Sequence, residues 1–495
     1  RPKRTLTNLL STYDLDPGAT VFIDTGSNGY ATRVDPTDAD GTVASPITFI
    51  GPTNGAVARF VGAPGMRDGL FLTNAKNVRI RALTIREFTN GVRLEGAATN
   101  NTMRGLMYPT NGFSGIYMNG SAVDQNRIVS NVIDGRDTQS AGVYLISGDR
   151  NTITNCRLYN TLNYAIHFAT GGASNAILEN AIYSNESYGL HLTGAAVDAN
   201  FIRGNVIDAR GTQSSGIYCS DGDGNLVTNN TIFGHTLYGI EMDTAAASNV
   251  IIGNTIRSNA QYGMYLNGTA VDANRIVENI IDGKGRQTNG IGVGDGDGNI
   301  ITNNTIRGHL GNGLAIGSTA ASNTVAGNNV LSNLTYGIYV SGAGVFRNRI
   351  VGNTIDGRGS GIGIRFVDAR ANVLTNNAIR NNLGQAGILV SYTAASNRIV
   401  ANAVYSNGPA GIEFDDTAPS PRENTVARNT VYRNGAVGIN IVRATNNRFL
   451  NNDVYAHTSR AIFAGIGASN WFINNLCLSN GAVGVTNAGP GARWE

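Results

Sequence analysis

The sequence predicts an all-β chain coiled into a parallel β-helix, a solenoid in which short strands stack on one another. A Gly, replaced by Ala in two units, is followed by apolar, variable and apolar residues eighteen times between Gly69 and Gly484, in units of 22 to 27 residues. In most units an Asn precedes an apolar residue by two positions, and the pair returns five residues later. Charged residues make up only 14 % of the chain, against roughly 25 % in ordinary domains, which disfavours helix-rich folds and disorder.

Residues 1–68 lack this repeat and are predicted to form an N-terminal cap with the first irregular coils. Residues 5–13 predict a short amphipathic helix, and residues 21–24 and 47–51 predict strands. An open end of a β-helix exposes unpaired strand edges, so a covering element is expected there.

Residues 69–495 are predicted to form the regular parallel β-helix as a single elongated domain. Each unit holds three short strands, and alternation with a period of two turns one side of each strand inward. Stacking of successive units closes these inward sides into one core. The recurring Asn, such as Asn126 and Asn131, fit turns, because Asn tolerates unusual backbone angles and can hydrogen-bond to the Asn above and below it.

A 74-residue super-repeat of three coils lies on top of the shorter period. Gly115, Gly189, Gly263, Gly337 and Gly411 are each 74 residues apart, and a longer turn occurs once per block, at residues 134–140, 208–214, 282–288 and 356–360. Each long turn starts with Asp and carries a basic residue two positions later. These basic residues stand in the slot that turn Asn fill in other coils, and we expect each to pair with its Asp: Arg136, Arg210, Lys284 and Arg358.

Composition and charge exclude several classes of protein. Lys and Arg number 37 against 34 Asp and Glu, a net charge of +3, which is not the basic field that a nucleic-acid binder needs. No apolar run is long enough to span a membrane, and the first residues lack the apolar stretch of a signal peptide. Three widely spaced cysteines predict no disulfide framework, and no phosphate-binding loop opens a helix.

The stretch from Pro17 to Ile23, the Asn-x-Ile coils and the Gly-Ile-x-Val strands together resemble the right-handed parallel β-helix superfamily. This superfamily includes pectate lyases, alginate lyases, mannuronan C5-epimerases and NosD-like proteins. The resemblance implies a right-handed coil and action on acidic polysaccharides along one exposed sheet. The epimerases carry a Tyr-Gly-Phe-Asp-Pro-His motif, and the closest segment here, residues 238–243, keeps Tyr238 and has Glu241 but lacks the Pro-His pair.

The residue two positions after each Gly is predicted to point outward from its strand. In seven consecutive coils this position holds only Tyr, His or Glu, with neighbours about 4.8 Å apart. The seven residues are Tyr117, Tyr144, His167, His191, Tyr218, Glu241 and Tyr265.

This stripe predicts a polysaccharide-binding groove. Aromatic faces stack on sugar rings, and basic side chains pair with uronate carboxylates. His191 is the expected proton-abstracting base, Tyr218 the acid, His167 a further catalytic candidate and Arg210 the carboxylate clamp. The expected substrate-binding residues are Tyr117, Tyr144, Tyr265, Arg136, Arg210, Lys284 and Arg286. The alternative is a stabilising ladder, because Tyr is favoured on exposed sheets and stacks with its neighbours.

Two carboxylate pairs allow a hydrolase as a further alternative. Glu241 with Asp243, and Glu413 with Asp415, lie two residues apart on one strand, hence on one face and about 6.5 to 7 Å apart. Inverting glycosidases place their two carboxyl groups at about 6.5–9.5 Å.

Other polar residues are assigned to structure or to a metal. Asp221, Asp223, Asp295 and Asp297 alternate with Gly as in calcium loops, without the Glu of an EF-hand, so calcium and plain Asx turns both remain open. His235, His309 and His457 stand where turn Asn stand elsewhere, and we expect them to replace those Asn. Cys156, Cys219 and Cys477 are expected to be buried, inert thiols.

These observations predict a secreted or cell-surface protein that binds an acidic polysaccharide and processes it, as a lyase or an epimerase. It would need no cofactor, with calcium as a candidate ion, and would bind no nucleic acid. The chain is expected to be a monomer or homotrimer and to form part of a longer chain. The rival hypothesis is a non-catalytic β-helix module of a large surface or adhesive protein, because duplication for length would give near-identical blocks. The second alternative is an inverting glycoside hydrolase that uses Glu241 and Asp243.

Overall fold

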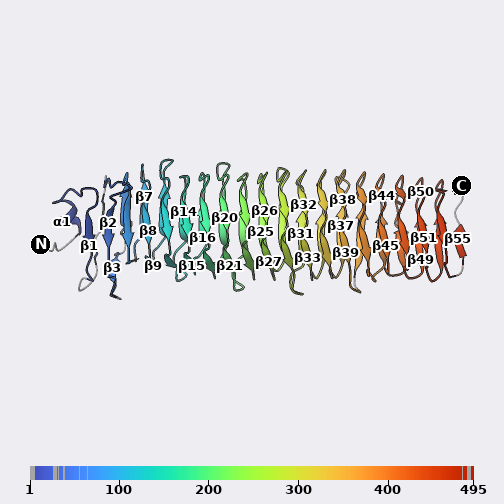
Figure 1. The fold of residues 1–495 in the computed structure, drawn as a ribbon, viewed down its shortest axis with the longest axis horizontal. Coiled ribbons are helices and arrows are strands. Elements are labelled where there is room, and N and C mark those ends of the chain that lie inside the picture. Colours follow the sequence, from blue (N-terminus) through green and yellow to red (C-terminus); the bar gives the residue numbers. More distant parts are fainter. Residues whose placement is uncertain are drawn as a thin grey trace. The chain divides into compact units, whose positions relative to one another are not determined.

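The computed structural model describes residues 6–25, 30–31, 33–36, 39–54, 56–63, 65–359, 361–481, 483–487 and 492–494. The chain divides into two compact units, Arg1–Thr236 and Leu237–Glu495. Each unit is a solenoid of parallel strands in three sheets (Figure 1). The described residues form about 19 turns, with coils of about 24 residues. The predicted all-β parallel solenoid is therefore confirmed, whereas the single elongated domain stays a prediction.

The sheets are named here after the motif that begins their strands. The Gly-led sheet holds the strands that start around the recurring Gly. The first and second Asn-led sheets hold the strands that follow the first and second Asn of each unit.

Three sheets make up the first unit. Its Gly-led sheet contains β4 (Asp68–Thr73), β7 (Asn90–Glu95), β10 (Ser114–Asn119), β13 (Ala141–Leu145), β16 (Tyr164–Phe168), β19 (Tyr188–Leu192) and β22 (Ser215–Cys219). Its first Asn-led sheet contains β1 (Thr20–Phe22), β2 (Ile47–Ile50), β5 (Val78–Arg81), β8 (Thr102–Arg104), β11 (Arg127–Val129), β14 (Thr152–Thr154), β17 (Ala176–Leu178), β20 (Phe201–Arg203) and β23 (Leu226–Thr228). Its second Asn-led sheet contains β3 (Ala58–Val61), β6 (Leu83–Arg86), β9 (Met107–Pro109), β12 (Val132–Asp134), β15 (Arg157–Tyr159), β18 (Ala181–Tyr183), β21 (Val206–Asp208) and β24 (Thr231–Phe233).

The second unit repeats the plan. Its Gly-led sheet contains β25 (Tyr238–Asp243), β28 (Tyr262–Asn267), β31 (Asn289–Val293), β34 (Asn312–Ile316), β37 (Tyr336–Ser341), β40 (Ile362–Val367), β43 (Ala386–Ser391), β46 (Ala410–Phe414), β49 (Val437–Arg443), β52 (Arg460–Ile466) and β55 (Val483–Asn487). Its first Asn-led sheet contains β26 (Val250–Ile252), β29 (Arg275–Val277), β32 (Ile300–Thr302), β35 (Thr324–Ala326), β38 (Arg349–Val351), β41 (Val373–Thr375), β44 (Arg398–Val400), β47 (Thr425–Ala427), β50 (Arg448–Leu450), β53 (Trp471–Ile473) and β56 (Arg493–Trp494). Its second Asn-led sheet contains β27 (Thr255–Arg257), β30 (Ile280–Asp282), β33 (Thr305–Arg307), β36 (Asn329–Leu331), β39 (Thr354–Asp356), β42 (Ala378–Arg380), β45 (Ala403–Tyr405), β48 (Thr430–Tyr432), β51 (Asp453–Tyr455) and β54 (Leu476–Leu478).

The N-terminal segment contains a short helix, and its role as a cap stays a prediction. Helix α1 (Leu6–Leu10) lies within the predicted helix, and its Leu6 is buried. Thr5, the predicted first residue, lies outside the described residues, as does Ser360 of the fourth long turn. No helix in the described part of the chain is long and apolar enough to cross a membrane.

The core of each unit is a stack of aliphatic side chains from the three sheets. The central residue of almost every three-residue strand is buried, as Ile128 and Ile133 are in the first unit and Ile276 and Ile281 are in the second. Parallel strands pair in exact register, for example Ile128 with Ile153. The predicted inward alternation is therefore confirmed.

Ladders of buried Asn join successive coils at the turns. The Asn279 side chain donates to Ile251 O (2.9 Å), Val277 O (3.0 Å) and Asn304 Oδ1 (3.0 Å). Its own Oδ1 accepts from the backbone N–H of Asn254 at 2.9 Å and from Asn254 Nδ2 at 3.0 Å. The ladder thus satisfies turn groups that would otherwise be buried without partners.

The recurring Gly produces an irregularity that the sequence pattern did not reveal. Pairing of β10 with β13 skips the Gly, because Ser114 pairs with Ala141 and Ile116 pairs with Val143. A Cβ on Gly115 would lie 2.9 Å from Gly142 O and 3.0 Å from Ile133 Cγ2. Both the Gly and the following residue therefore face inward, as in a β-bulge. In β16 and β19 the residue before the Gly position, Tyr164 or Tyr188, lies on the outer side together with the residue two positions after it. In the other coils of the first unit the residue before the Gly is buried, as Ser114 and Ala141 are.

Candidate functional site: an aromatic face on the Gly-led sheet

Aromatic side chains cover part of the outer surface of the Gly-led sheet in the first unit. We call this surface the aromatic face. The bulge at each Gly lets one strand present two rings, so β16 contributes both Tyr164 and His167, and β19 both Tyr188 and His191. The aromatic face consists of Phe113, Tyr117, Tyr144, Tyr164, His167, Tyr188, His191 and Tyr218.

The rings contact one another from coil to coil. Tyr117 and Tyr144 stack with ring centroids 5.8 Å apart and planes 5° apart. Tyr164 and His191 stack at 4.5 Å and 1°, and His191 lies over Tyr218 at 5.1 Å and 21°. The predicted outward stripe from Tyr117 to Tyr218 is thus one contiguous set of ring contacts.

Sequence reasoning missed Tyr164 and Tyr188, because strict alternation assigns the residue before the Gly to the interior. The signal was nevertheless present, since a Tyr precedes the Gly-equivalent position in these two consecutive coils. The structure places both rings within 5 Å of His191, with centroid distances of 4.5 and 4.8 Å.

Burial among rings keeps both histidines neutral. It lowers the pKa of His167 to about 3, with a further contribution from His191, and lowers the pKa of His191 to about 4. Nδ1 of each ring is shielded from solvent and has no hydrogen-bond partner among the described residues. His167 Nε2 lies 3.3 Å from Thr193 Oγ1. A His that accepts a proton on Nε2 carries its resident proton on Nδ1, usually held by an acceptor. In the part of the chain that the structure describes, no such acceptor faces Nδ1 of His191.

Tyr117 and Tyr144 stay protonated at neutral pH. Burial is the largest cause that raises the pKa of Tyr117 and of Tyr144. Their phenol groups are therefore hydrogen-bond donors and acceptors rather than bases.

Three basic residues of the long turns, Arg136, Arg210 and Lys284, pair with their own Asp, as expected, whereas Asp356 pairs with Arg380 and accepts a hydrogen bond from the backbone N–H of Arg358. Arg136 Nε lies 3.4 Å from Asp134 Oδ2, and Lys284 Nζ lies 3.2 Å from Asp282 Oδ2. The guanidinium of Arg210 lies 4.2 Å from the ring centroid of Tyr183, on the second Asn-led sheet. The structure thus directs Arg210 toward that sheet.

One placement in these turns was wrong. Arg136, Arg210, Lys284 and Arg358 do not occupy the buried Asn slot; all four are exposed. Backbone N–H groups of Arg136 and Arg210 instead bond to Asp134 Oδ1 and Asp208 Oδ1. A Gln later in the turn fills the buried slot, because its longer side chain reaches back inside. These buried residues are Gln139, Gln213 and Gln287.

The remaining predicted groove residues belong to the second unit. Tyr265 stacks with Tyr262 at 4.7 Å and donates its hydroxyl to Asn267 Oδ1 at 3.2 Å. Asp243 Oδ1 accepts from the backbone N–H of Thr244 at 2.7 Å. Glu241 is half-buried beside it on β25, and Arg286 is exposed.

The other carboxylate pair is more enclosed. Glu413 is buried, accepts a hydrogen bond from Gln385 Nε2 at 2.8 Å, and burial raises its pKa. Asp415 Oδ2 accepts from Ser391 Oγ at 2.6 Å. Glu413 is thus the buried carboxyl group of the pair and Asp415 the hydrogen-bonded neighbour. The two lie in different environments, as the acid and the base of a catalytic carboxyl pair do.

The predicted calcium ligands link neighbouring coils. Asp297 Oδ1 accepts from the backbone N–H of Ala321 at 2.7 Å, and Asp295 Oδ1 accepts from Thr319 Oγ1 at 3.0 Å. Asp221 Oδ2 accepts from Oγ of its neighbour Ser220 at 2.8 Å. The backbone N–H of Asp223 donates to Asp198 Oδ1. Among the described residues no three His, Cys, Asp or Glu are grouped so as to hold a metal ion. Calcium binding here stays a prediction.

The remaining His and Cys are structural. His309 Nδ1 lies 2.7 Å from Asn333 Oδ1, and His457 Nε2 lies 3.1 Å from Val431 O. His235 is buried in the same slot. Cys156 and Cys219 are buried free thiols, and Cys477 is a half-buried one. Burial raises the pKa of Cys156 to about 11, so its reactive thiolate is scarce.

Comparison with known proteins places this fold in a family. The family described as "Right handed beta helix region" matches residues 68–212, 141–306 and 289–454. The chain belongs to this family. The right-handed coil implied by the resemblance is therefore confirmed. A comparison of this β-helix protein with curated protein sequences gives no match.

Solved structures similar to this β-helix protein include three with low identity. An alginate lyase from Paenibacillus sp. str. FPU-7 is 16 % identical, with a TM-score of 0.34, 60 % of this chain and 92 % of that chain covered. The Dettilon tailspike protein is 18 % identical, with a TM-score of 0.40 and coverage of 68 % and 64 %. The periplasmic alginate epimerase AlgG is 13 % identical, with a TM-score of 0.30 and coverage of 80 % and 77 %.

Proposed function

We propose that the protein binds a polysaccharide on the aromatic face of its first unit. The observation that carries this proposal is the contiguous stack of rings, half-buried for the most part, on the outer surface of a rigid sheet. Rings fixed by their neighbours lose little freedom when a ligand covers them, so stacking on a sugar costs little ordering entropy. Phenol hydroxyls at the rim supply hydrogen bonds to sugar hydroxyls.

The same site favours binding over proton transfer. A pKa of about 4 makes His191 a weak base, and no acceptor orients its ring through Nδ1. Arg210, the proposed carboxylate clamp, is engaged with Asp208 and Tyr183. A non-catalytic module is thus the form of the proposal that these contacts support, and its place in a secreted or cell-surface protein is part of the proposal.

A lyase or epimerase is the second candidate, favoured by the contact of His191 with Tyr218 at 5.1 Å between ring centroids. In the lyase version, His191 takes the C5 proton of a uronate and Tyr218 donates a proton to the glycosidic oxygen. The C4–O bond breaks and a C4–C5 double bond forms. Epimerisation would share the proton abstraction and return a proton to the opposite face.

A binding experiment tests the proposal. Calorimetric titration with a panel of neutral and acidic oligosaccharides should identify a ligand for the unmodified protein. Replacement of two rings, in the variant Tyr144→Ala with Tyr218→Ala, should then weaken binding about tenfold, since each ring contact contributes about 0.5–1.5 kcal/mol. The matched control is Tyr405→Ala with Tyr432→Ala, which removes a pair stacked at 4.8 Å on the second Asn-led sheet.

Binding that falls equally in both double variants, or that no member of the panel shows, would refute the aromatic face as a glycan site. The lyase version has its own test, because unsaturated uronate absorbs ultraviolet light. His191→Phe keeps the ring stack and removes the base. If product forms and disappears with His191→Phe while binding persists, the site is catalytic; without product on any acidic glycan, the lyase version fails.

A further inference from the structure

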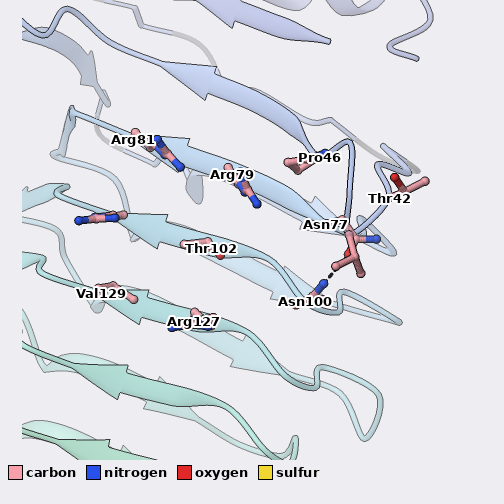
Figure 2. Close-up of a pocket in the computed structure, with 11 residues that line it drawn as sticks. Thr42, Pro46, Asn77, Arg79, Arg81, Asn100, Thr102, Arg127 and Val129 are labelled. Carbon is pink, nitrogen blue, oxygen red and sulfur yellow. Dashed lines mark hydrogen bonds between the residues drawn. The ribbon is translucent and has the colours of Figure 1, made fainter. Parts of the chain in front are cut away.

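A basic groove lies on the outer surface of the first Asn-led sheet in the first unit, away from the Gly-led sheet. It has a volume of about 370 Å³. The strands β5, β8 and β11 form its floor, and the turn at residues 42–46 forms one wall (Figure 2). We call it the arginine groove, after Arg79, Arg81, Arg104 and Arg127.

Strand register sets these arginines side by side. Arg81 pairs with Arg104 on the next strand, and Arg79 and Arg127 flank Thr102 on both sides. Figure 2 shows Arg79, Thr102 and Arg127 following one another across three strands. Neighbouring parallel strands lie about 4.8 Å apart, so positive charges recur at this spacing or twice it.

Among the described residues, the four arginines have no acidic partners. No ion pair or side-chain hydrogen bond joins any of them to another residue in the described ranges. The Nε atom of Arg81 is shielded from solvent and has no partner there either. Like charges on adjacent strands destabilise a sheet, so this arrangement has a cost that an anion would remove.

Neutral polar groups complete the groove. Asn77 Nδ2 donates to Gly41 O at 2.8 Å, which ties the turn to the sheet, and Asn100 Nδ2 donates to Asn77 Oδ1. Thr42 Oγ1 accepts from the backbone N–H of Ser45 at 2.9 Å, which fixes the turn. The wall is therefore preformed. Val43, which is 75 % exposed, and Pro46 line the groove from this turn.

We propose that the arginine groove binds an acidic oligosaccharide through its carboxylate or sulfate groups. Planar guanidinium groups bind such oxyanions with two parallel hydrogen bonds. The recurrence of arginines along the strand stack suits a ligand with repeated charges rather than a single small anion. The Asn and Thr side chains suit the hydroxyls between those charges. The site lies on another sheet than the aromatic face and does not depend on it.

Calorimetric titration at low salt tests this site with three probes: a sulfated heparin tetrasaccharide, a polygalacturonate tetrasaccharide and a neutral cello-oligosaccharide. We expect the acidic probes to bind and the neutral one not to bind at this site. The variant Arg79→Gln with Arg104→Gln should weaken binding of the acidic probes at least tenfold. The matched control is Arg275→Gln with Arg349→Gln, two exposed arginines on the same kind of sheet in the second unit, which should change binding less than twofold.

The relative affinity of the sulfated and uronate probes tells which oxyanion the groove takes. Equal losses in both double variants would show mere charge attraction and overturn the proposal, as would tighter binding of duplex DNA or inorganic phosphate. Tyr144→Ala with Tyr218→Ala should leave the arginine-dependent binding unchanged. Failure of the aromatic-face proposal is thereby distinguishable from failure of this one.

Discussion

At the residue scale, His167 and His191 show how a parallel stack of strands controls side-chain chemistry. Each histidine is covered by rings from the coils on either side, and burial is the first cause of the low pKa values. The same covering that makes the histidines poor bases makes them flat, uncharged surfaces at neutral pH. The aromatic face therefore presents rings, and not charges, to a ligand.

The histidines should make stability depend on pH. Because their folded pKa values, about 3 and about 4, lie below the ordinary 6.5, the unfolded chain binds more protons between these values. Their contribution is fully present above about pH 6.5 and is lost as the pH falls toward 4. The variant His167→Phe with His191→Phe should flatten this loss, measured as urea midpoints from pH 7.5 to 4.5. Tyr218→Phe should keep the unmodified profile, and an unchanged slope in the double variant would contradict the pKa assignment.

At the element scale, each ladder Asn joins three coils. Asn279→Ala removes three donated and two accepted hydrogen bonds and leaves buried backbone groups unpaired. We expect a destabilisation of about 3 kcal/mol, since an unsatisfied buried group costs about 1–3 kcal/mol. Urea denaturation followed by circular dichroism measures it. Asn329→Ala, at an exposed position of β36, should change stability by less than about 0.5 kcal/mol. If Asn279→Ala and Asn329→Ala change the free energy of unfolding equally, the Asn ladder does not stabilise the fold.

The sequence predicted the elements well where a local period governs them. Alternation identified buried residues such as Ile202 and Ile207, and the Asn spacing identified the turns. It failed where two residues in a row face the same side, as Gly115 and Ile116 do, because no periodic rule anticipates a bulge. It also failed in the long turns, where the reach of Gln213 decides which side chain enters the core. The sequence did not predict the arginine groove, because the residues that line it come from a turn and three coils.

At the scale of the whole molecule, the 74-residue period makes the chain modular. Removal of residues 263–336 from the second unit joins Tyr262 to Gly337, which restores the Tyr-Gly sequence and the strand register. Because each coil contacts mainly its neighbours, we expect the shortened protein to fold, with an unchanged β-type circular dichroism spectrum per residue. Removal of residues 263–299, which ends partway through a coil, should give an insoluble or unfolded chain. If both shortened proteins fold cooperatively, the stacking of coils does not require the strands to keep their register.

In β16 and β19 one strand carries two outward rings, and successive coils of the aromatic face follow one another at a fixed step. That step, about 4.8 Å, is close to the advance of one sugar along an extended glycan. If the aromatic face binds a glycan as proposed, the number of coils that carry rings sets the number of sugars in contact with it. Duplication of a three-coil block would lengthen the aromatic face without changing its existing contacts. Replacement of one outward ring would change the surface at a single coil.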